Sequence, residues 1–324
     1  MHGMIQNMAI NIMNNSSPAK VMEITMDEED WSSDLHMVFL KDFGGVIRDN
    51  MSPNCPKLSV LLMKDDYGLQ KIPECFFMHL VQLKVLNLTN SNIEELPGSI
   101  SELIHLRALV LRSCSKLSRM PSVVKMRSLK KLDLSLCKNL QAVPDGLENL
   151  VDLRYLDICW TKIYGLCDGL RHRLVKIQYL GFNLINGGVS LSVLERLERL
   201  RCSFSDVNEL YLFAESNPHL PSHYDLFIGV KETTYYTDDD DDRFKIWSEN
   251  ISRCGKVIRI HGREDYEIRG SEDIHLLAVE GRGGVRLVAL YIFFFGRILA
   301  LYISSEGTDS RQLLEIKVAL HRIS

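Results

Sequence analysis

Apolar residues recur along the middle of the chain in groups of six, with leucine or isoleucine at the first, fourth and sixth positions of the clearest groups. Alternate residues of a strand point to opposite faces, so the fourth and sixth positions lie on one face of a short strand. Consecutive groups start 23 to 25 residues apart. The spacing predicts one strand per group, at the groups that begin with Leu35, Leu58, Leu83, Leu106, Leu129, Leu153 and Ile177.

The segments between these groups contain a second apolar position, and in four of them an apolar residue precedes proline. Proline cannot continue a helix and favours extended or turn backbone. One turn of such a chain cannot bury its apolar face, whereas stacked turns share a continuous core. The pattern is the signature of leucine-rich repeats. It predicts a curved, β-rich α/β solenoid with parallel strands on the concave face and irregular or 3-10 segments on the convex face.

The repeat pattern also predicts the organisation of the chain. We expect leucine-rich repeats over 35–188 and irregular repeats or a capping region over 189–281, with strands near YDLFIGV, IRIHG and HLLAVEG. The apolar tail over 282–324 fits neither the irregular repeats nor a capping region. Before the repeats, 1–18 contains a short amphipathic helix and 19–34 forms an acidic link.

One apolar stretch, 285–303, has the density of a membrane span but contains Arg286 and Arg297. An arginine near the centre of a membrane helix costs about 2.5–3.5 kcal/mol on insertion scales. We therefore expect buried strands there rather than a membrane span.

A small or polar residue follows three positions after the last apolar residue of several groups. In repeats of this kind, asparagine or cysteine at this position hydrogen-bonds the backbone turn inside the solenoid. We therefore expect a structural role, without redox or metal chemistry, for the two cysteines of the set. The set consists of Ser91, Cys114, Cys137 and Thr161.

Composition excludes several classes of protein. With 46% hydrophobic and 25% charged residues, the chain is not wholly disordered. Its 38 Lys and Arg against 42 Asp and Glu give a net charge of −4, so no basic excess points to nucleic acid or an anionic membrane. The eight cysteines form no CxxC pair, which favours buried thiols in a reducing, cytoplasmic compartment. The N-terminus lacks the features of a secretory signal.

The sequence contains no pattern typical of an enzyme or a metal site. The GxSxG, HExxH and phosphate-loop GxxxxGK[ST] motifs are absent. His219 and His223 stand four apart, but Pro221 disfavours a helix that presents both to a metal. The aspartates of 238–242 lack the spacing of a calcium loop and fit a solvated loop better. We expect no enzyme activity, no metal and no cofactor.

Two parts of the chain resemble the plant nucleotide-binding leucine-rich-repeat disease resistance proteins, in their coiled-coil subclass. MHGMIQNMAINI resembles the Met-His-Asp segment that closes the family's nucleotide-binding module. The repeats resemble the family through CPKLSVLLM, LKVLNLTNSNIEELPGSISELIHLRALVLRSCSKLSRMPS and LRYLDICWTKI. His2 matches the motif histidine that approaches the nucleotide phosphates, whereas Gly3 stands where the family has aspartate. The resemblance implies that 1–18 is a remnant helix of that module.

Because the phosphate loop is missing, this resemblance implies a receptor truncated on its N-terminal side, without tight ADP binding or nucleotide hydrolysis. It implies a non-enzymatic interaction module that recognises pathogen-derived or guarded host proteins and restrains the nucleotide-binding switch. The alternative is a generic leucine-rich-repeat scaffold, or a non-functional receptor fragment without a dedicated partner. A nucleotide switch acting alone is disfavoured. Partners are expected to be proteins, including a receptor's nucleotide-binding module, rather than nucleic acid or membrane.

Positions between the core leucines are expected to face outward on the concave sheet and to form columns along the solenoid. Mixed charge beside a tyrosine suits a protein partner, although a solvated strand face is the alternative. Substitutions at such exposed positions would change stability by less than about 0.5 kcal/mol each. The candidate partner contacts are Val85, Asn87, Arg112, Lys131, Asp133, Tyr155 and Asp157.

Overall fold

The computed structural model divides the chain into two compact units, which are described separately. The first holds the residues up to Gly181 together with 193–196, and the second holds 182–192 and the residues from 197 onward. The described residues are 20–23, 28–40, 44–166, 168–184, 189–205, 209, 212–213, 216–217, 221, 223–228, 256–261, 277–280, 286–294 and 297–305.

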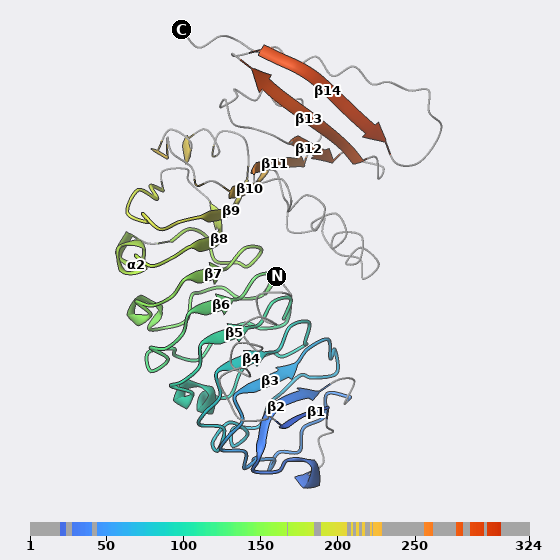
Figure 1. The fold of residues 1–324 in the computed structure, drawn as a ribbon, viewed down its shortest axis with the longest axis vertical. Helices are drawn as coiled ribbons and strands as arrows, with labels where there is room; N and C mark the ends of the chain where they lie inside the picture. Colours follow the sequence, from blue (N-terminus) through green and yellow to red (C-terminus); the bar gives the residue numbers. More distant parts are fainter. Residues whose placement is uncertain are drawn as a thin grey trace. The chain divides into compact units, whose positions relative to one another are not determined.

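Parallel strands stacked side by side form the first unit (Figure 1). Each strand pairs in parallel with the next along the chain. All seven predicted strand positions are confirmed. The strands are β1 (Lys20–Glu23), β2 (Leu35–Leu40), β3 (Val60–Met63), β4 (Val85–Asn87), β5 (Ala108–Val110), β6 (Lys131–Asp133), β7 (Tyr155–Asp157) and the first half of β8 (Tyr179–Leu184), whose residues from Phe182 onward belong to the second unit.

The first strand, β1, lies where the sequence predicts an acidic link. Its KVME sequence lacks the leucine spacing of the repeats, yet it pairs with β2 from Lys20 to Glu23. A short edge strand needs only backbone groups to extend a sheet, which explains why the repeat pattern does not reveal it.

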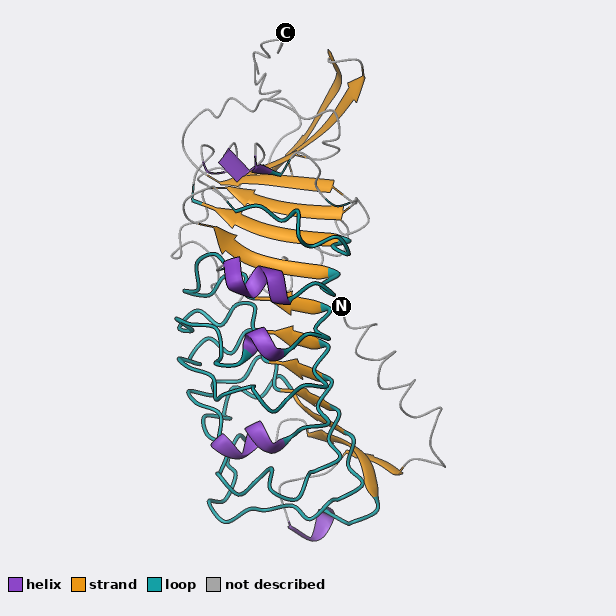
Figure 2. Cartoon of the chain, turned by 90° about the vertical axis from the view of Figure 1, so that its left-hand side faces the viewer, coloured by secondary structure: helices purple, strands orange, loops and turns teal. Residues whose placement is uncertain are grey.

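The return segments between strands are mostly loops, as Figure 2 shows. Their helices are short: η1 (Glu28–Asp30), η2 (Gly98–Glu102), η3 (Leu147–Asn149) and α2 (Asp168–Arg173). In η2, Pro97 occupies the residue before the helix and has an extended backbone. The expected irregular and 3-10 character of these segments is thus confirmed in the described part of the first unit.

The core of the first unit is a column of leucines contributed one per strand. Leu86, Leu109 and Leu132 face one another in register, and each is 0% exposed. Leu61 and Leu156 extend the column on either side and are equally buried. Each turn therefore buries its leucine against the turns before and after it, so stability is shared between neighbouring repeats.

The turns are tied internally by the small polar residues that the sequence identifies. The Sγ of Cys114 donates to the Leu88 carbonyl at 3.1 Å, and the Sγ of Cys137 donates to the Leu111 carbonyl at 3.1 Å. Thr161 Oγ1 donates to the Ile158 carbonyl at 2.8 Å. Burial raises the pKa of the Cys137 thiol, which keeps the hydrogen on the sulfur. The predicted hydrogen bonds of these turn residues are confirmed.

One non-glycine residue in each of five successive turns adopts a left-handed backbone. Each of the first four donates its backbone N–H to the following turn, at 2.8 to 2.9 Å. A left-handed backbone costs roughly 1–2 kcal/mol for an L-residue with a side chain. The five residues, with φ in degrees, are Asp65 (62), Asn90 (59), Ser113 (61), Leu136 (66) and Trp160 (57).

We predict that Ser113→Gly raises the free energy of unfolding by about 0.5–1 kcal/mol, because glycine adopts φ > 0 without steric cost. Ser113→Val should lower it, since a β-branched residue resists this backbone. Urea unfolding followed by circular dichroism measures both. Ser118→Gly is the control, because Ser118 is exposed and lacks a positive φ. A glycine at Ser118 that stabilises as much as one at Ser113 would refute the explanation.

The second unit begins with parallel strands and ends with an antiparallel pair. β9 (Arg199–Phe204), β10 (His223–Ile228), β11 (Lys256–His261) and β12 (Leu277–Glu280) pair in parallel in that order. β13 (Arg286–Phe294) pairs antiparallel with β12 and with β14 (Arg297–Ser305). The expectation of strands in 285–303 is thus confirmed, whereas the expected burial of their side chains stays a prediction. In the described part of the chain, no helix has the length and apolar character needed to cross a membrane.

Candidate interaction surface

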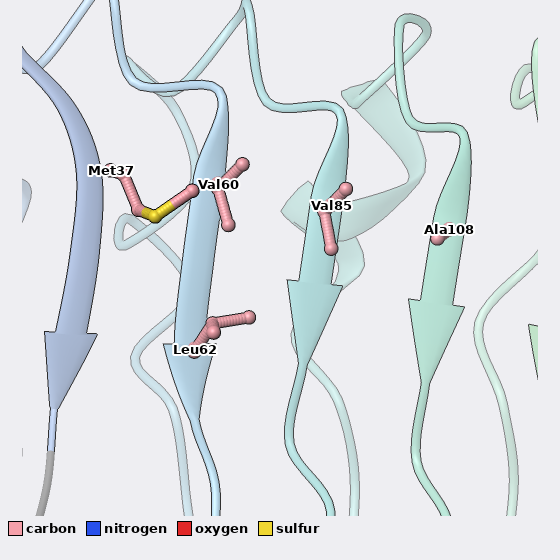
Figure 3. Packing of buried hydrophobic residues seen from close by; sticks show 5 residues of the cluster. All are labelled: Met37, Val60, Leu62, Val85 and Ala108. Atoms are coloured by element: carbon pink, nitrogen blue, oxygen red, sulfur yellow. The ribbon is translucent and has the colours of Figure 1, made fainter. Parts of the chain in front are cut away.

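The sheet face opposite the leucine core, here called the concave face, has an apolar zone over β2 to β5. Five side chains, each at most 9% exposed, form a cluster there, and the partly buried Phe39 packs against it. Figure 3 shows them side by side across neighbouring strands. They are Met37, Val60, Leu62, Val85 and Ala108.

A charged and aromatic zone follows on β6 to β8. Parallel register sets Lys131 beside Tyr155, and Tyr155 beside Tyr179. The two tyrosine rings stack with centroids 4.1 Å apart and planes 10° apart. Lys131 Nζ lies 3.9 Å from the centroid of the Tyr155 ring, which is the geometry of a cation–π contact.

Two buried aspartates occupy the next column of the same zone. Asp133 and Asp157 are 1% and 0% exposed and face each other in register. Ser135 Oγ donates to Asp133 Oδ1 at 2.7 Å, and the Tyr179 hydroxyl donates to Asp157 Oδ2 at 2.9 Å. The Cys159 backbone N–H donates to Asp157 Oδ1 at 3.1 Å. These hydrogen bonds allow both carboxylates to remain in a buried site.

Glycine 181 completes this zone on β8. It stands in register with Asp157, and a β-carbon at this position would overlap the Asp157 carboxylate. The absence of a side chain at Gly181 therefore leaves the room that the aspartate needs. Tyr179 and Gly181 are missing from the candidates that the sequence alone yields, although they occupy the same repeat positions as Tyr155 and Asp157.

One nitrogen of Lys131 in this zone and one of Arg112, just beyond β5, lack a hydrogen-bond acceptor among the described residues. Lys131 Nζ lies 3.8 Å from Asp133 Oδ2, which is beyond hydrogen-bond distance. Lys131 Nζ and Arg112 Nη1 are both buried, and neither has an acceptor among the described residues. Burial lowers the pKa of Lys131, and the nearby charge of Arg112 lowers it further. The negative charges of Asp133 and Asp157 act in the opposite direction and raise it. A buried cation without an acceptor is costly, and the carboxylate of a bound partner would satisfy it.

Burial contradicts the expectation that these columns are open to solvent. Of the seven candidate partner contacts, Arg112 is half-buried, and the other six are at most 6% exposed. Contacts between neighbouring strands cover part of these side chains, such as the stacking of Tyr155 on Tyr179 and the contact of Lys131 Nζ with the Tyr155 ring. The predicted exposure of the six is therefore wrong. Their role in partner binding stays a prediction. The six are Val85, Asn87, Lys131, Asp133, Tyr155 and Asp157.

The other sites considered in the sequence are not assembled in the described structure. No three His, Cys, Asp or Glu side chains are grouped to hold a metal ion within the described residues. His223 lies on β10, whereas His2, His219 and the aspartates of 238–242 lie outside the described residues.

One short parallel strand per repeat, a leucine column and turns tied by cysteine and threonine define a leucine-rich-repeat protein. Residues 42–223, more than half of the chain, match the family described as the leucine-rich repeat region. The chain belongs to this family, whose repeat regions are typically non-catalytic.

The repeats are homologous to those of plant disease resistance proteins. Disease resistance protein At4g27190 of Arabidopsis thaliana is 37% identical over 108 residues, which are 33% of this chain and 11% of the relative. Disease resistance protein RFL1 of the same plant is 30% identical over 192 residues, which are 56% of this chain and 21% of the relative. The chain therefore spans only a small part of the length of these relatives.

A solved plant receptor is also similar. It is the peptide hormone receptor RGFR1 in complex with RGF2, with 17% identity and a TM-score of 0.35 over 81% of this chain and 47% of that chain.

Proposed function

We propose that this chain is a non-enzymatic protein-interaction module of a plant immune receptor of the coiled-coil subclass. It recognises a pathogen-derived or guarded host protein and restrains the receptor's nucleotide-binding module. Homology of the repeats to plant disease resistance proteins supports the receptor assignment. The alternative, a generic scaffold without a dedicated partner, rests on the fact that a fold alone does not fix a function.

The observation that carries the binding proposal is the pair of cationic donors without acceptors, Lys131 Nζ and Arg112 Nη1. Buried polar groups in proteins are nearly always hydrogen-bonded, so these two donors have room for an acceptor that a bound partner can supply. Arg112 lies two residues beyond β5 and is only half-buried, so it is the more accessible of the two cations. A guanidinium binds a carboxylate with two parallel hydrogen bonds. We propose that the six buried candidates hold this part of the surface in position.

Replacing the guanidinium tests this function. We expect Arg112→Gln to weaken binding to a purified, ADP-loaded nucleotide-binding module of the coiled-coil receptor subclass at least tenfold. Loss of one charge-assisted bidentate contact accounts for about 1.5–3 kcal/mol. The melting temperature should stay within 2–4 °C of the parent, since glutamine keeps most of the length of this half-buried side chain and removes a charge that lacks an acceptor at Nη1. Biolayer interferometry and thermal melts give the two readouts.

The matched control is Lys125→Gln on a return segment, where Lys125 Nζ pairs with Glu102 Oε1 at 2.6 Å in an exposed site. It removes one charge, as Arg112→Gln does, and should leave binding within twofold. Equal loss with both variants, or no loss with either, would contradict a binding role for the concave face and favour the scaffold alternative.

A further inference from the structure

A second surface lies where the strands begin. The second residue of the six-residue group is basic in four successive repeats, at Lys84, Arg107, Lys130 and Arg154, here called the basic ladder. Backbone hydrogen bonds join these residues directly: Arg107 N–H donates to the Lys84 carbonyl at 2.7 Å and Lys130 N–H to the Arg107 carbonyl at 2.9 Å. Arg154 N–H donates to the Lys130 carbonyl at 2.9 Å. At about 4.8 Å per strand, the ladder is about 14 Å long.

The side chains of the basic ladder are accessible and lack acidic partners. Arg107 and Arg154 are exposed, and Lys84 and Lys130 are half-buried. None of the four forms an ion pair with a described residue. Asp152, an acid close enough to Lys130 and Arg154 to be influenced by them, pairs with Lys176 Nζ at 2.6 Å. Lys176 is also the main cause of the lowered pKa of Asp152, to which Lys130 and Arg154 contribute less.

Some cations elsewhere in the first unit do have acidic partners, so the absence of ion pairs is not a general property of the repeats. On the return segments, Lys71 pairs with Asp49 at 4.0 Å and Lys125 with Glu102 at 2.6 Å. Arg119 pairs with Glu95 in the same way. Each of these acids lies about one repeat before its cation. Three cations of the return segments are thus paired, whereas none of the four cations of the basic ladder pairs with a described residue.

An apolar column runs parallel to the basic ladder. Two positions before the first leucine of each group stand Val81, Ile104, Val151 and Val175, which are 49%, 47%, 48% and 47% exposed. The fifth member of the column is Arg127, an exposed cation. A single exposed aliphatic residue is ordinary, but four at the same repeat position, two on either side of Arg127, form a column of exposed apolar side chains, which is typical of an interaction site.

We propose that the basic ladder and this apolar column together bind an acidic amphipathic helix of a partner protein. The spacing of about 4.8 Å between strands is near the 5.4 Å pitch of an α-helix, so one carboxylate per helical turn can meet one cation per strand. Aliphatic side chains beside those carboxylates would cover the valines and isoleucine.

The composition of this surface favours a protein over nucleic acid. Proteins that bind single-stranded nucleic acid combine cations with aromatic side chains on which bases stack. The apolar column contains only aliphatic residues beside Arg127, and the chain as a whole has a net charge of −4. This surface is separate from the concave face, so it goes beyond the function proposed above.

A charge-reversal variant tests the proposal in the full-length chain. The probe is a fluorescein-labelled helical peptide of 16 residues with a glutamate stripe beside a leucine stripe. We expect the parent chain to bind it, and Arg107→Glu, Lys130→Glu and Arg154→Glu together to weaken binding at least 30-fold. Raising the salt concentration should weaken binding to the parent as well, because exposed ion pairs are screened. Fluorescence anisotropy measures the dissociation constants.

The matched control reverses three cations on the return segments, Lys71→Glu, Arg119→Glu and Lys125→Glu, which changes the net charge by the same amount. Binding should stay within threefold of the parent. Replacing the leucine stripe of the peptide by serine should weaken binding to the parent, and Arg112→Gln should leave it unchanged. The proposal is overturned if the parent does not bind the peptide, if both triple variants lose binding equally, or if a single-stranded DNA of 12 nucleotides binds more tightly.

Discussion

Leu132→Asp should abolish the cooperative unfolding of the first unit and lower its free energy of unfolding by more than about 5 kcal/mol. Removing a buried leucine side chain alone costs about 2.7–5 kcal/mol, and a carboxylate without a partner in an apolar core adds a desolvation penalty. Leu132 is 0% exposed and stands between Leu109 and Leu156 in the leucine column. The charge would therefore face the core of three successive repeats.

Urea unfolding and hydrogen exchange measure this effect. Exchange should accelerate in β5, β6 and β7 together, because these strands share the affected core. Leu132→Met is the control, since a swap that conserves volume costs less than about 1.5 kcal/mol. Leu109→Asp should behave like Leu132→Asp. A variant that keeps the full cooperative transition would show that the leucine register is wrong.

The second large effect is expected at the buried aspartate of the charged zone. Asp157→Ala should lower the free energy of unfolding by about 3–5 kcal/mol, as is typical when one member of a buried charged network is removed. The change leaves the Tyr179 hydroxyl and the Cys159 N–H without the acceptor that each uses in the structure. It also removes one of the two carboxylates that oppose the effect of burial on Lys131.

Asp157→Asn separates shape from charge, because the amide oxygen can still accept from the Cys159 N–H, and the Tyr179 hydroxyl can turn to accept from the amide NH2. We expect it to cost less than the alanine variant. Asp145→Ala, at an exposed aspartate, should change stability by less than about 0.5 kcal/mol. Chemical denaturation measures the free energy of unfolding of the three variants. Equal stability of Asp157→Ala and Asp145→Ala would show that the buried hydrogen-bond network around Asp157 does not stabilise the fold.

The strands could be predicted from sequence because their signal is local and repeated. Leucines at fixed spacing specify both the strand and the face that is buried, and the predicted groups contain β2 to β7. The cysteine hydrogen bonds in the turns follow from the same register. The edge strand β1 could not be predicted, because backbone pairing with a neighbouring strand leaves no pattern in its side chains.

The burial of the concave face could not be predicted for a different reason. Whether Lys131 or Tyr155 is accessible depends on side chains of neighbouring strands, which lie about 24 residues away in the sequence. The stacking of Tyr155 on Tyr179 becomes visible only when two repeats are aligned position by position. That alignment would also have revealed Gly181 opposite Asp157. The sequence thus predicts which residues of the concave face share a column. How those side chains pack, and therefore whether they are buried, depends on the sizes of side chains on several neighbouring strands.

The left-handed residue that follows each of the strands β3 to β7 has a consequence for how the molecule can change in evolution. Ser113 donates its N–H to Ser135, and Leu136 donates to Cys159, so each turn is fixed to the next at one position of the repeat. A single residue inserted between Leu109 and Ser113 would displace this bond and turn core side chains outward. Duplication or loss of a complete repeat preserves it. Recombination between repeats can therefore lengthen or shorten the basic ladder by one cation at a time, and so alter the length of acidic helix that it matches, without repacking the core.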